Sequence, residues 1–285
     1  RAIGFSDITK KDLEMILDEV ITRPEIMKIT KDSEGNEFAE LSGSFAANAG
    51  ITVRGTYQED DSFHMDYYYP YVFGTSITTN EQIDVEKHAE KESYAGVCDE
   101  VNLGVTLIFY IQNVADYLAE TNRHLSKIHY GAMLAGLSTE GKILCPVVER
   151  KKNDVPAIQK NDRHNQLIAQ AREGDEDAIE SLTLEDMDTY ALLSQRVMKE
   201  DIFSIVKSTF MPFGIESDQY TVLGEIIDCV TMENKLTHEK LYGMKLLCNN
   251  IQFDVCINEK DLLGEPAIGR RFRGNVWMQG NLCLE

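Results

Sequence analysis

The sequence lacks the features that mark membrane and secreted proteins. No hydrophobic run is long enough to cross a bilayer, and the most apolar stretch, residues 105–111, is short and predicts a buried strand. No signal-peptide pattern stands at the start of the chain, although the absence of an initiator methionine leads us to expect that residues precede Arg1. We therefore expect a cytoplasmic protein that does not associate with a membrane.

Paired cysteines are also lacking. Six cysteines are scattered through 285 residues, none stands in a Cys-x-x-Cys pair, and no Asn-x-Ser/Thr sequon occurs. This scatter is typical of reduced, mostly buried thiols and not of a disulfide framework. It agrees with a cytoplasmic location.

Basic residues are few. The chain has 28 Lys and Arg residues against 48 Asp and Glu residues, which gives a net charge of -20. Binding to nucleic acid or to an anionic membrane requires Lys and Arg side chains that replace counterions, so both partners are disfavoured for the molecule as a whole. The partners that remain are a small molecule or another protein.

The common catalytic and nucleotide-binding motifs are absent. The sequence has no phosphate-binding Gly-x-x-x-x-Gly-Lys-Ser/Thr loop, no Gly-x-Gly-x-x-Gly, no His-Glu-x-x-His and no Gly-x-Ser-x-Gly. We accordingly predict no cofactor and no metal site. An active site assembled from residues that are distant in the sequence remains an alternative, so whether the protein is an enzyme stays open.

Apolar periodicity and turn residues predict an α+β protein with three parts. Residues 1–148 show a helix after Thr9 and then strand-like runs joined by short turns, which favour a mostly antiparallel sheet with helices. Residues 149–208 are predicted to form a charged linker and acidic helices. Residues 209–285 return to strands and predict a small β-barrel, OB-like or SH3-like.

The most informative segment is the predicted last strand. At period two its side chains separate into an apolar set and a set that is cationic, amide-bearing and aromatic. The apolar set is Phe272, Val276 and Met278; the other set includes Arg271, Arg273, Asn275 and Trp277. We predict that the second set is a ligand-binding surface for an acidic or aromatic ligand. In the alternative, the arginines pair with acids of the chain itself, such as Glu216, Glu225 or Asp228.

Aromatic residues are concentrated between Tyr67 and Phe73. Such a strand is suited to stacking on sugars or to clasping a Pro-rich peptide, and equally to packing between a sheet and a helix, with Pro70 marking a sheet edge. A further hypothesis is that this strand forms a homodimer.

A weak catalytic candidate lies between residues 86 and 100, where His88, Cys98, Asp99 and Glu100 occur close together. A Cys–His nucleophile needs a stabilised thiolate, whereas the acids around Cys98 are expected to raise its pKa. Metal binding by His88 with Asp99 or Glu100 is not supported by a diagnostic spacing.

Several segments resemble an uncharacterised family of anaerobic Gram-positive bacteria. They include residues 1–6, 92–98, 174–190, 211–214, 219–225, 253–257 and 264–280. The resemblance covers essentially the whole chain. It implies a bacterial cytoplasmic protein with a domain of unknown function, and it implies no activity, cofactor or catalytic residue.

Taken together, these features favour a non-enzymatic ligand- or partner-binding protein with an adaptor or regulatory role. The alternative is an enzyme with an acid/base site in a cleft between the N-terminal and C-terminal domains, using His88, Asp99 or Glu100.

Overall fold

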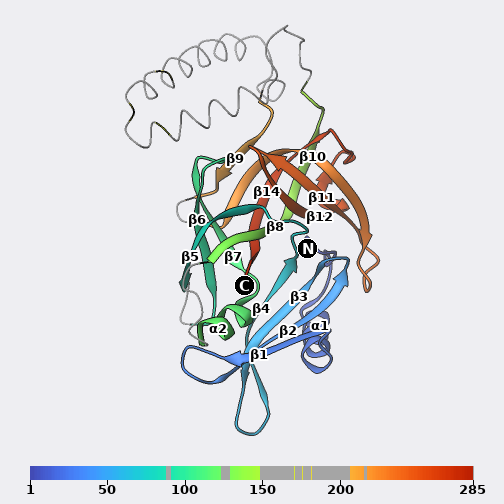
Figure 1. Ribbon diagram of the computed structural model, residues 1–285. Coiled ribbons are helices and arrows are strands. Elements are labelled where there is room, and N and C mark those ends of the chain that lie inside the picture. The colour runs from blue at the N-terminus through green and yellow to red at the C-terminus, as the bar shows by residue number, and fades with distance from the viewer. Residues whose placement is uncertain are drawn as a thin grey trace. The chain divides into compact units, whose positions relative to one another are not determined.

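The fold is known from a computed structural model that describes residues 1–87, 91–122, 129–147, 170, 175, 181, 206–214 and 217–284. Residues 1–145 and 208–285 form one compact unit, whose described residues are drawn in colour in Figure 1. Residues 146–207 form a second unit, of which too few residues are described for an account of its structure.

The first helix, α1 (Lys10–Thr22), begins as the sequence predicts. Thr9 is its N-cap: the Thr9 hydroxyl accepts a hydrogen bond from the Asp12 amide, and the Asp12 carboxylate accepts one from the Thr9 amide. This reciprocal capping satisfies two N–H groups at the start of the helix. Ile16, Leu17 and Val20 are buried, so the helix packs through one apolar face.

The smaller sheet is antiparallel, in the order β1-β2-β3-β4. Its strands are β1 (Ile26–Lys31), β2 (Glu37–Ala46), β3 (Ala49–Tyr57) and β4 (Phe63–Val72). Leu41 and Val53 lie on one face and belong to the same apolar cluster as Leu17 of α1. Because side chains alternate along a strand, the residues between these apolar positions point to the opposite face.

The larger sheet combines strands from the middle of the chain with strands from its C-terminal part. Its strands are β5 (Thr79–Lys87), β6 (Tyr94–Glu100), β7 (Val105–Ile111), β8 (His129–Leu144), β9 (Thr209–Pro212), β10 (Gln219–Glu233), β11 (Lys240–Cys248), β12 (Ile251–Asn258), β13 (Leu262–Leu263) and β14 (Arg271–Leu282). Helix α2 (Val114–Asn122) follows β7, and a short 3-10 helix, η1 (Glu259–Asp261), precedes β13. A hairpin turn at Asn249 and Asn250, both with positive φ, joins β11 to β12.

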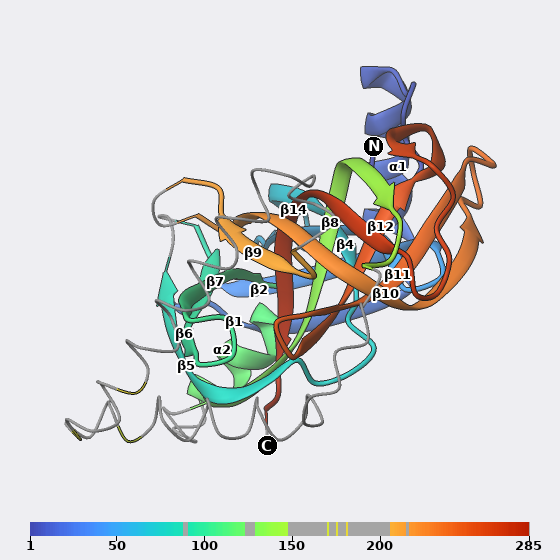
Figure 2. The same cartoon turned by 90° about the horizontal axis from the view of Figure 1, so that it is seen from above.

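Strands β8 and β14 lie side by side at the centre of this sheet (Figures 1 and 2). They complete two closed circuits of hydrogen-bonded strands, one through β5, β6 and β7 and the other through β12, β11 and β10. The prediction of a separate small β-barrel in the C-terminal region is therefore wrong. The circuit of C-terminal strands closes only by including β8, which pairs in parallel with β12 and antiparallel with β14.

The α+β prediction is also wrong, because the described chain is mostly β, with α1 and α2 as its two α-helices. The acidic helices predicted in the segment 149–208 lie almost entirely outside the described residues. No helix in the described part of the chain is both long and apolar enough to cross a membrane.

Candidate functional site

One face of the smaller sheet is polar and nevertheless buried. The sheet register aligns Lys28, Glu40, Arg54 and Tyr67 in one row across its four strands. A second row aligns Ser42, Thr52 and Tyr69 beside it. A polar sheet face normally points to water. Here the end of β7 and helix α2 cover it, so its polar groups require partners within the protein.

Arg54 is the centre of the first row and has no solvent exposure. Its Nε and Nη2 lie 2.8 and 2.7 Å from Oε2 of Glu40. Its Nη1 donates to the hydroxyls of Tyr67 and Tyr110, and its Nη2 donates to the carbonyl oxygen of Gln112 at 2.6 Å. Tyr110 and Gln112 belong to the β7 region, so the guanidinium connects the two sheets.

Glu40 is the buried acid of this face. Burial raises the pKa of its carboxyl above the ordinary value, and the positive charge of Arg54 offsets part of that rise. Both bonds from Arg54 reach Oε2. The second oxygen, Oε1, receives no hydrogen bond from the described residues.

A cavity of about 330 Å³ opens beside this face, within the same compact unit. It is lined by residues of the smaller sheet, α2, β8 and β14 and of the segments that follow β4 and β7: Ile26, Lys28, Glu40, Ser42, Thr52, Tyr69, Phe73, Gln112, Asn113, Asp116, Met133, Asn281 and Leu282. This volume lies at the small end of the range for ligand sites, about 300–1,000 Å³. An apolar lining with a small number of polar groups is also usual for such sites.

Gln112 is the least satisfied polar residue of the lining. The residue is 3% exposed, and its Nε2 donates to the Val72 carbonyl oxygen and to Gln279 Oε1. Its own Oε1 has no hydrogen-bond partner among the described residues. A buried acceptor without a partner costs on the order of 1–3 kcal/mol. Because Gln112 is a lining residue, a donor that reaches this oxygen from the cavity would remove that cost.

The rim of the cavity carries a balanced pair of charges, because Lys28 Nζ lies 2.6 Å from Asp116 Oδ2. With Arg54 and Glu40 also paired, the charges around the cavity cancel. Phe73 adds an aromatic wall and stacks on Tyr71 with ring centroids 4.3 Å apart. The site therefore suits a neutral molecule that offers hydrogen-bond donors and one apolar face.

On the last strand, β14, the alternation predicted from the sequence separates the core side chains correctly. Phe272, Val276 and Met278 are all buried. Arg271 does not share the exposed surface predicted for it: it is 5% exposed, and its Nε donates to the carbonyl oxygen of Cys145 at 2.9 Å. Burial lowers the pKa of this guanidinium.

Arg273 and Asn275 are exposed and line a second cavity, of about 340 Å³, beside β8. Asn275 Oδ1 accepts a hydrogen bond from the Thr221 hydroxyl at 2.8 Å. Trp277 is half-buried, and its indole N–H donates to Asp218 at 2.6 Å. The structure thus brings Arg273 and Asn275 together at one cavity and gives Arg271 and Trp277 internal partners.

The predicted acid/base residues have separate structural surroundings. Cys98 lies in the apolar core, where burial and then the nearby carboxylates raise the pKa of its thiol to about 12. Asp99 is exposed and accepts from the Thr106 hydroxyl, whereas buried Glu100 accepts from Asn102. His88 lies outside the described residues.

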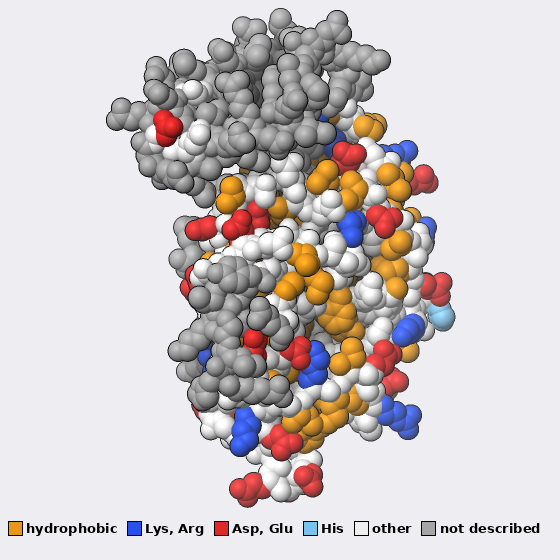
Figure 3. All heavy atoms as spheres, viewed as in Figure 1, with side chains coloured by type: hydrophobic (Ala, Val, Ile, Leu, Met, Phe, Trp, Pro, Cys, Tyr) orange, Lys and Arg blue, Asp and Glu red, His pale blue; other side chains and the backbone are white. Residues whose placement is uncertain are grey.

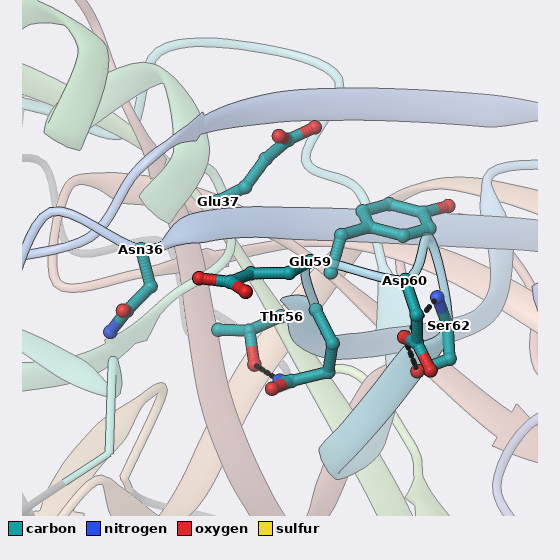
Figure 4. A pocket seen from close by; sticks show the side chains of 8 residues that line it. Asn36, Glu37, Thr56, Glu59, Asp60 and Ser62 are labelled. Atoms are coloured by element: carbon teal, nitrogen blue, oxygen red, sulfur yellow. Dashed lines mark hydrogen bonds between the residues drawn. The ribbon is translucent and has the colours of Figure 1, made fainter.

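An acidic hollow at the start of β2, the end of β3 and the turn between β3 and β4 does not form a site (Figure 4). The carboxylates of Glu37, Glu59 and Asp60 point in different directions, and Asp60 accepts hydrogen bonds from Ser62. Across the described residues, no group of three or more His, Cys, Asp or Glu side chains is placed to hold a metal ion.

Sequence reasoning missed Glu40, Arg54 and Gln112. The signal was present in β3, where Ile51, Thr52, Val53 and Arg54 alternate between apolar and polar. This alternation is the usual pattern of a strand with one face in water. The second covering layer comes from β7 and α2, which are distant in sequence, and so the pattern alone does not reveal it.

Fold and site together define a mostly β, two-sheet protein with a small cavity of mixed apolar and polar lining between its sheets. The chain belongs to the family described as "Domain of unknown function, E. rectale Gene description (DUF3881)", whose model matches residues 1–280. The resemblance inferred from the sequence is thereby confirmed at the level of the family, which is named for an anaerobic Gram-positive bacterium. No curated protein and no solved structure matches the chain.

Proposed function

We propose that this protein is a non-enzymatic binding protein for a small neutral molecule rich in O–H donors, of the sugar or polyol class. The observation that carries the proposal is the unpartnered Oε1 of Gln112 in the lining of the inter-sheet cavity. Oε1 of Glu40 is a second acceptor without a hydrogen bond from the described residues. Two acceptors beside an aromatic wall match a ligand with several hydroxyl groups and an apolar ring face.

Charge supports a neutral ligand over a charged one. The two cations and two anions around the cavity pair with each other, Arg54 with Glu40 and Lys28 with Asp116. A charged ligand would have to break one of these pairs or remain unpaired itself, and both outcomes cost free energy in a partly buried site.

The first test is a calorimetric titration of the full chain with D-glucose, D-galactose, myo-inositol and glycerol. We expect at least one of them to bind. The variant Met133→Trp should abolish that binding, because the larger side chain fills the cavity that Met133 lines without touching its polar groups. Met65→Trp is the matched control, since Met65 is 38% exposed on β4 and outside this cavity. Equal affinities in the two variants, or no binding by any probe, would refute the proposal.

A second candidate function is catalysis at the same cavity with Glu40 as the acid or base. Its raised pKa favours this reading, because a buried carboxyl with a pKa nearer neutrality transfers protons more readily at physiological pH. Glu40→Gln keeps an acceptor for Arg54 and removes the titrating group. If a bound sugar is converted by the unmodified chain and not by this variant, as followed by mass spectrometry, the protein is an enzyme.

The same proposal includes a cytoplasmic location and excludes nucleic acid as a partner. All six cysteines are free, which agrees with a reducing compartment. The net charge of -20 opposes binding to nucleic acid.

A homodimer through β4 stays a prediction: β4 is at the edge of the smaller sheet, and Tyr68 is 41% exposed there. Sedimentation at micromolar concentration distinguishes a dimer from a monomer.

A further inference from the structure

An apolar groove lies between α1 and the turn that joins β10 to β11. Its volume is about 320 Å³, and its lining consists of Phe5, Ile8, Asp12, Met15, Ile16, Glu19, Leu236 and Thr237. Phe5 and Ile16 are each 7% exposed and form the buried part of the lining. Met15 and Leu236 are 53% and 49% exposed, so two large apolar side chains of the groove are open to water. Exposed apolar side chains that gather in one place, unlike single ones, mark an interaction surface.

The turn that carries Leu236 is fixed by buried hydrogen bonds. Asn234 has no solvent exposure, and its Oδ1 accepts hydrogen bonds from the amides of Leu236 and Thr237. The Asn234 Nδ2 donates to the carbonyl oxygen of Ile3, and the Thr237 hydroxyl donates to that of Gly4. The backbone at Leu236 is thus ordered before any partner arrives. A preordered surface loses less conformational entropy on binding.

The charged residues of the groove are both acids. Asp12 and Glu19 are seven residues apart on α1, so they share one face of the helix and lie about 10 Å apart along its axis. Hydrogen bonds from Thr9 lower the pKa of the Asp12 carboxyl, which is therefore ionised at neutral pH. On the face of the molecule in Figure 3, basic and acidic side chains are interspersed. The lining of the groove, which is described in full, instead combines two carboxylates with neither Lys nor Arg.

We propose that this groove binds an amphipathic helical segment of another protein, one whose apolar side chains are flanked by Lys or Arg. Such a helix presents residues at i, i+3, i+4 and i+7 on one side, which matches an apolar groove with acids seven residues apart. Burial of apolar surface supplies affinity, and the two acids select a basic partner over an acidic one. This surface is independent of the proposed sugar or polyol site, because the groove and the inter-sheet cavity share no lining residue.

The test is a titration of the full chain into a fluorescein-labelled, amphipathic helical peptide of Leu and Lys, followed by fluorescence anisotropy. We expect binding, and we expect Leu236→Ser to weaken it by about tenfold, the loss typical of an apolar side chain that a partner covers. Leu263→Ser is the matched control, because Leu263 is 67% exposed on β13 and lies outside the groove. Matched peptides with Glu in place of Lys, or Ser in place of Leu, should bind more weakly.

A second pair of variants separates the groove from the net charge of the chain. Glu19→Gln and Glu14→Gln each remove one negative charge from α1, but Glu14 lies outside the groove and its side chain is 63% exposed. Glu19→Gln should weaken binding of the Leu and Lys peptide by about threefold, the scale of an exposed ion pair, and Glu14→Gln should leave it nearly unchanged.

Three results would overturn the proposal. The first is no binding of the Leu and Lys peptide by the unmodified chain. The second is equal affinity of Leu236→Ser and Leu263→Ser, which would place the peptide elsewhere on the surface. The third is equal weakening by Glu19→Gln and Glu14→Gln, which would reduce the charge effect to the net charge of the molecule.

Discussion

At the scale of single residues, the Arg54 guanidinium is one of the groups that connect the two sheets. Arg54 donates to acceptors from β2, β4 and β7, and it is fully buried. Its charge is compensated by Glu40, so each partner is stable in the interior only while the other is present.

Arg54→Met should therefore lower the free energy of unfolding by about 3–5 kcal/mol, because it leaves Glu40 buried without its partner. Chemical denaturation measures the loss. The double variant with Glu40→Leu as well should regain part of that stability, since it removes the orphaned charge. A single variant as stable as the unmodified chain would contradict this account of the pair.

The pKa of Glu92 is shifted in the opposite direction to that of Glu40, and the shift predicts how stability depends on pH. Burial alone raises the pKa of this carboxyl, but hydrogen bonds from Ser33, Tyr94 and Lys87 outweigh it and hold the pKa below the ordinary glutamate value of 4.5. A carboxyl with a lowered pKa in the folded state stabilises above its unfolded pKa, and the contribution disappears as the pH falls through the folded value.

We thus expect stability to decrease as the pH falls below about 4.5, and Glu92→Gln to make that decrease shallower. Denaturation midpoints of the two proteins, recorded over a series of acidic pH values, provide the comparison. Asp99→Asn serves as a control, because Asp99 is an exposed acid on β6 with a single hydroxyl partner. Parallel pH profiles for the unmodified chain and Glu92→Gln would show that Glu92 has no such role.

At the scale of elements, β8 determines how the C-terminal strands fold. It lies between β12 and β14 and so closes their circuit of hydrogen bonds. Local sequence identifies most strands and α1, because apolar alternation, the Thr9 cap and the Asn249-Asn250 turn are short-range signals. The insertion of β8 is a long-range pairing, which leaves no mark in the C-terminal sequence. A separate barrel was therefore the natural but incorrect prediction.

The fragment of residues 209–285 should not fold alone, because β12 and β14 each lose a partner strand without β8. Circular dichroism of the fragment should show no cooperative thermal transition, whereas the full chain should show one. A cooperative transition in the fragment would instead support an independent C-terminal domain.

At the scale of the whole molecule, residues 1–145 and 208–285 form a compact unit without the intervening segment. Replacing residues 149–205 by a flexible Gly/Ser linker should leave the cooperative unfolding of this unit intact, as followed by circular dichroism. Loss of cooperativity would mean that the replaced segment contributes to its core.

The packing of one sheet on the other explains why the candidate site was only partly predictable from the sequence. Arg273 and Asn275 were predicted because both side chains alternate away from the core within one strand. Glu40 and Gln112 meet only when the second sheet covers the first, and no local pattern encodes that layering. The cavity between the sheets is the feature on which the proposed function depends.

The most direct test of that function is a crystal structure of the full chain soaked in the sugar or polyol that binds most tightly in solution. The account predicts density for the ligand in the inter-sheet cavity, with hydroxyl groups within hydrogen-bond distance of Gln112 Oε1 and Glu40 Oε1. Density for ordered water alone on those two oxygens, with the ligand absent or bound elsewhere, would contradict it.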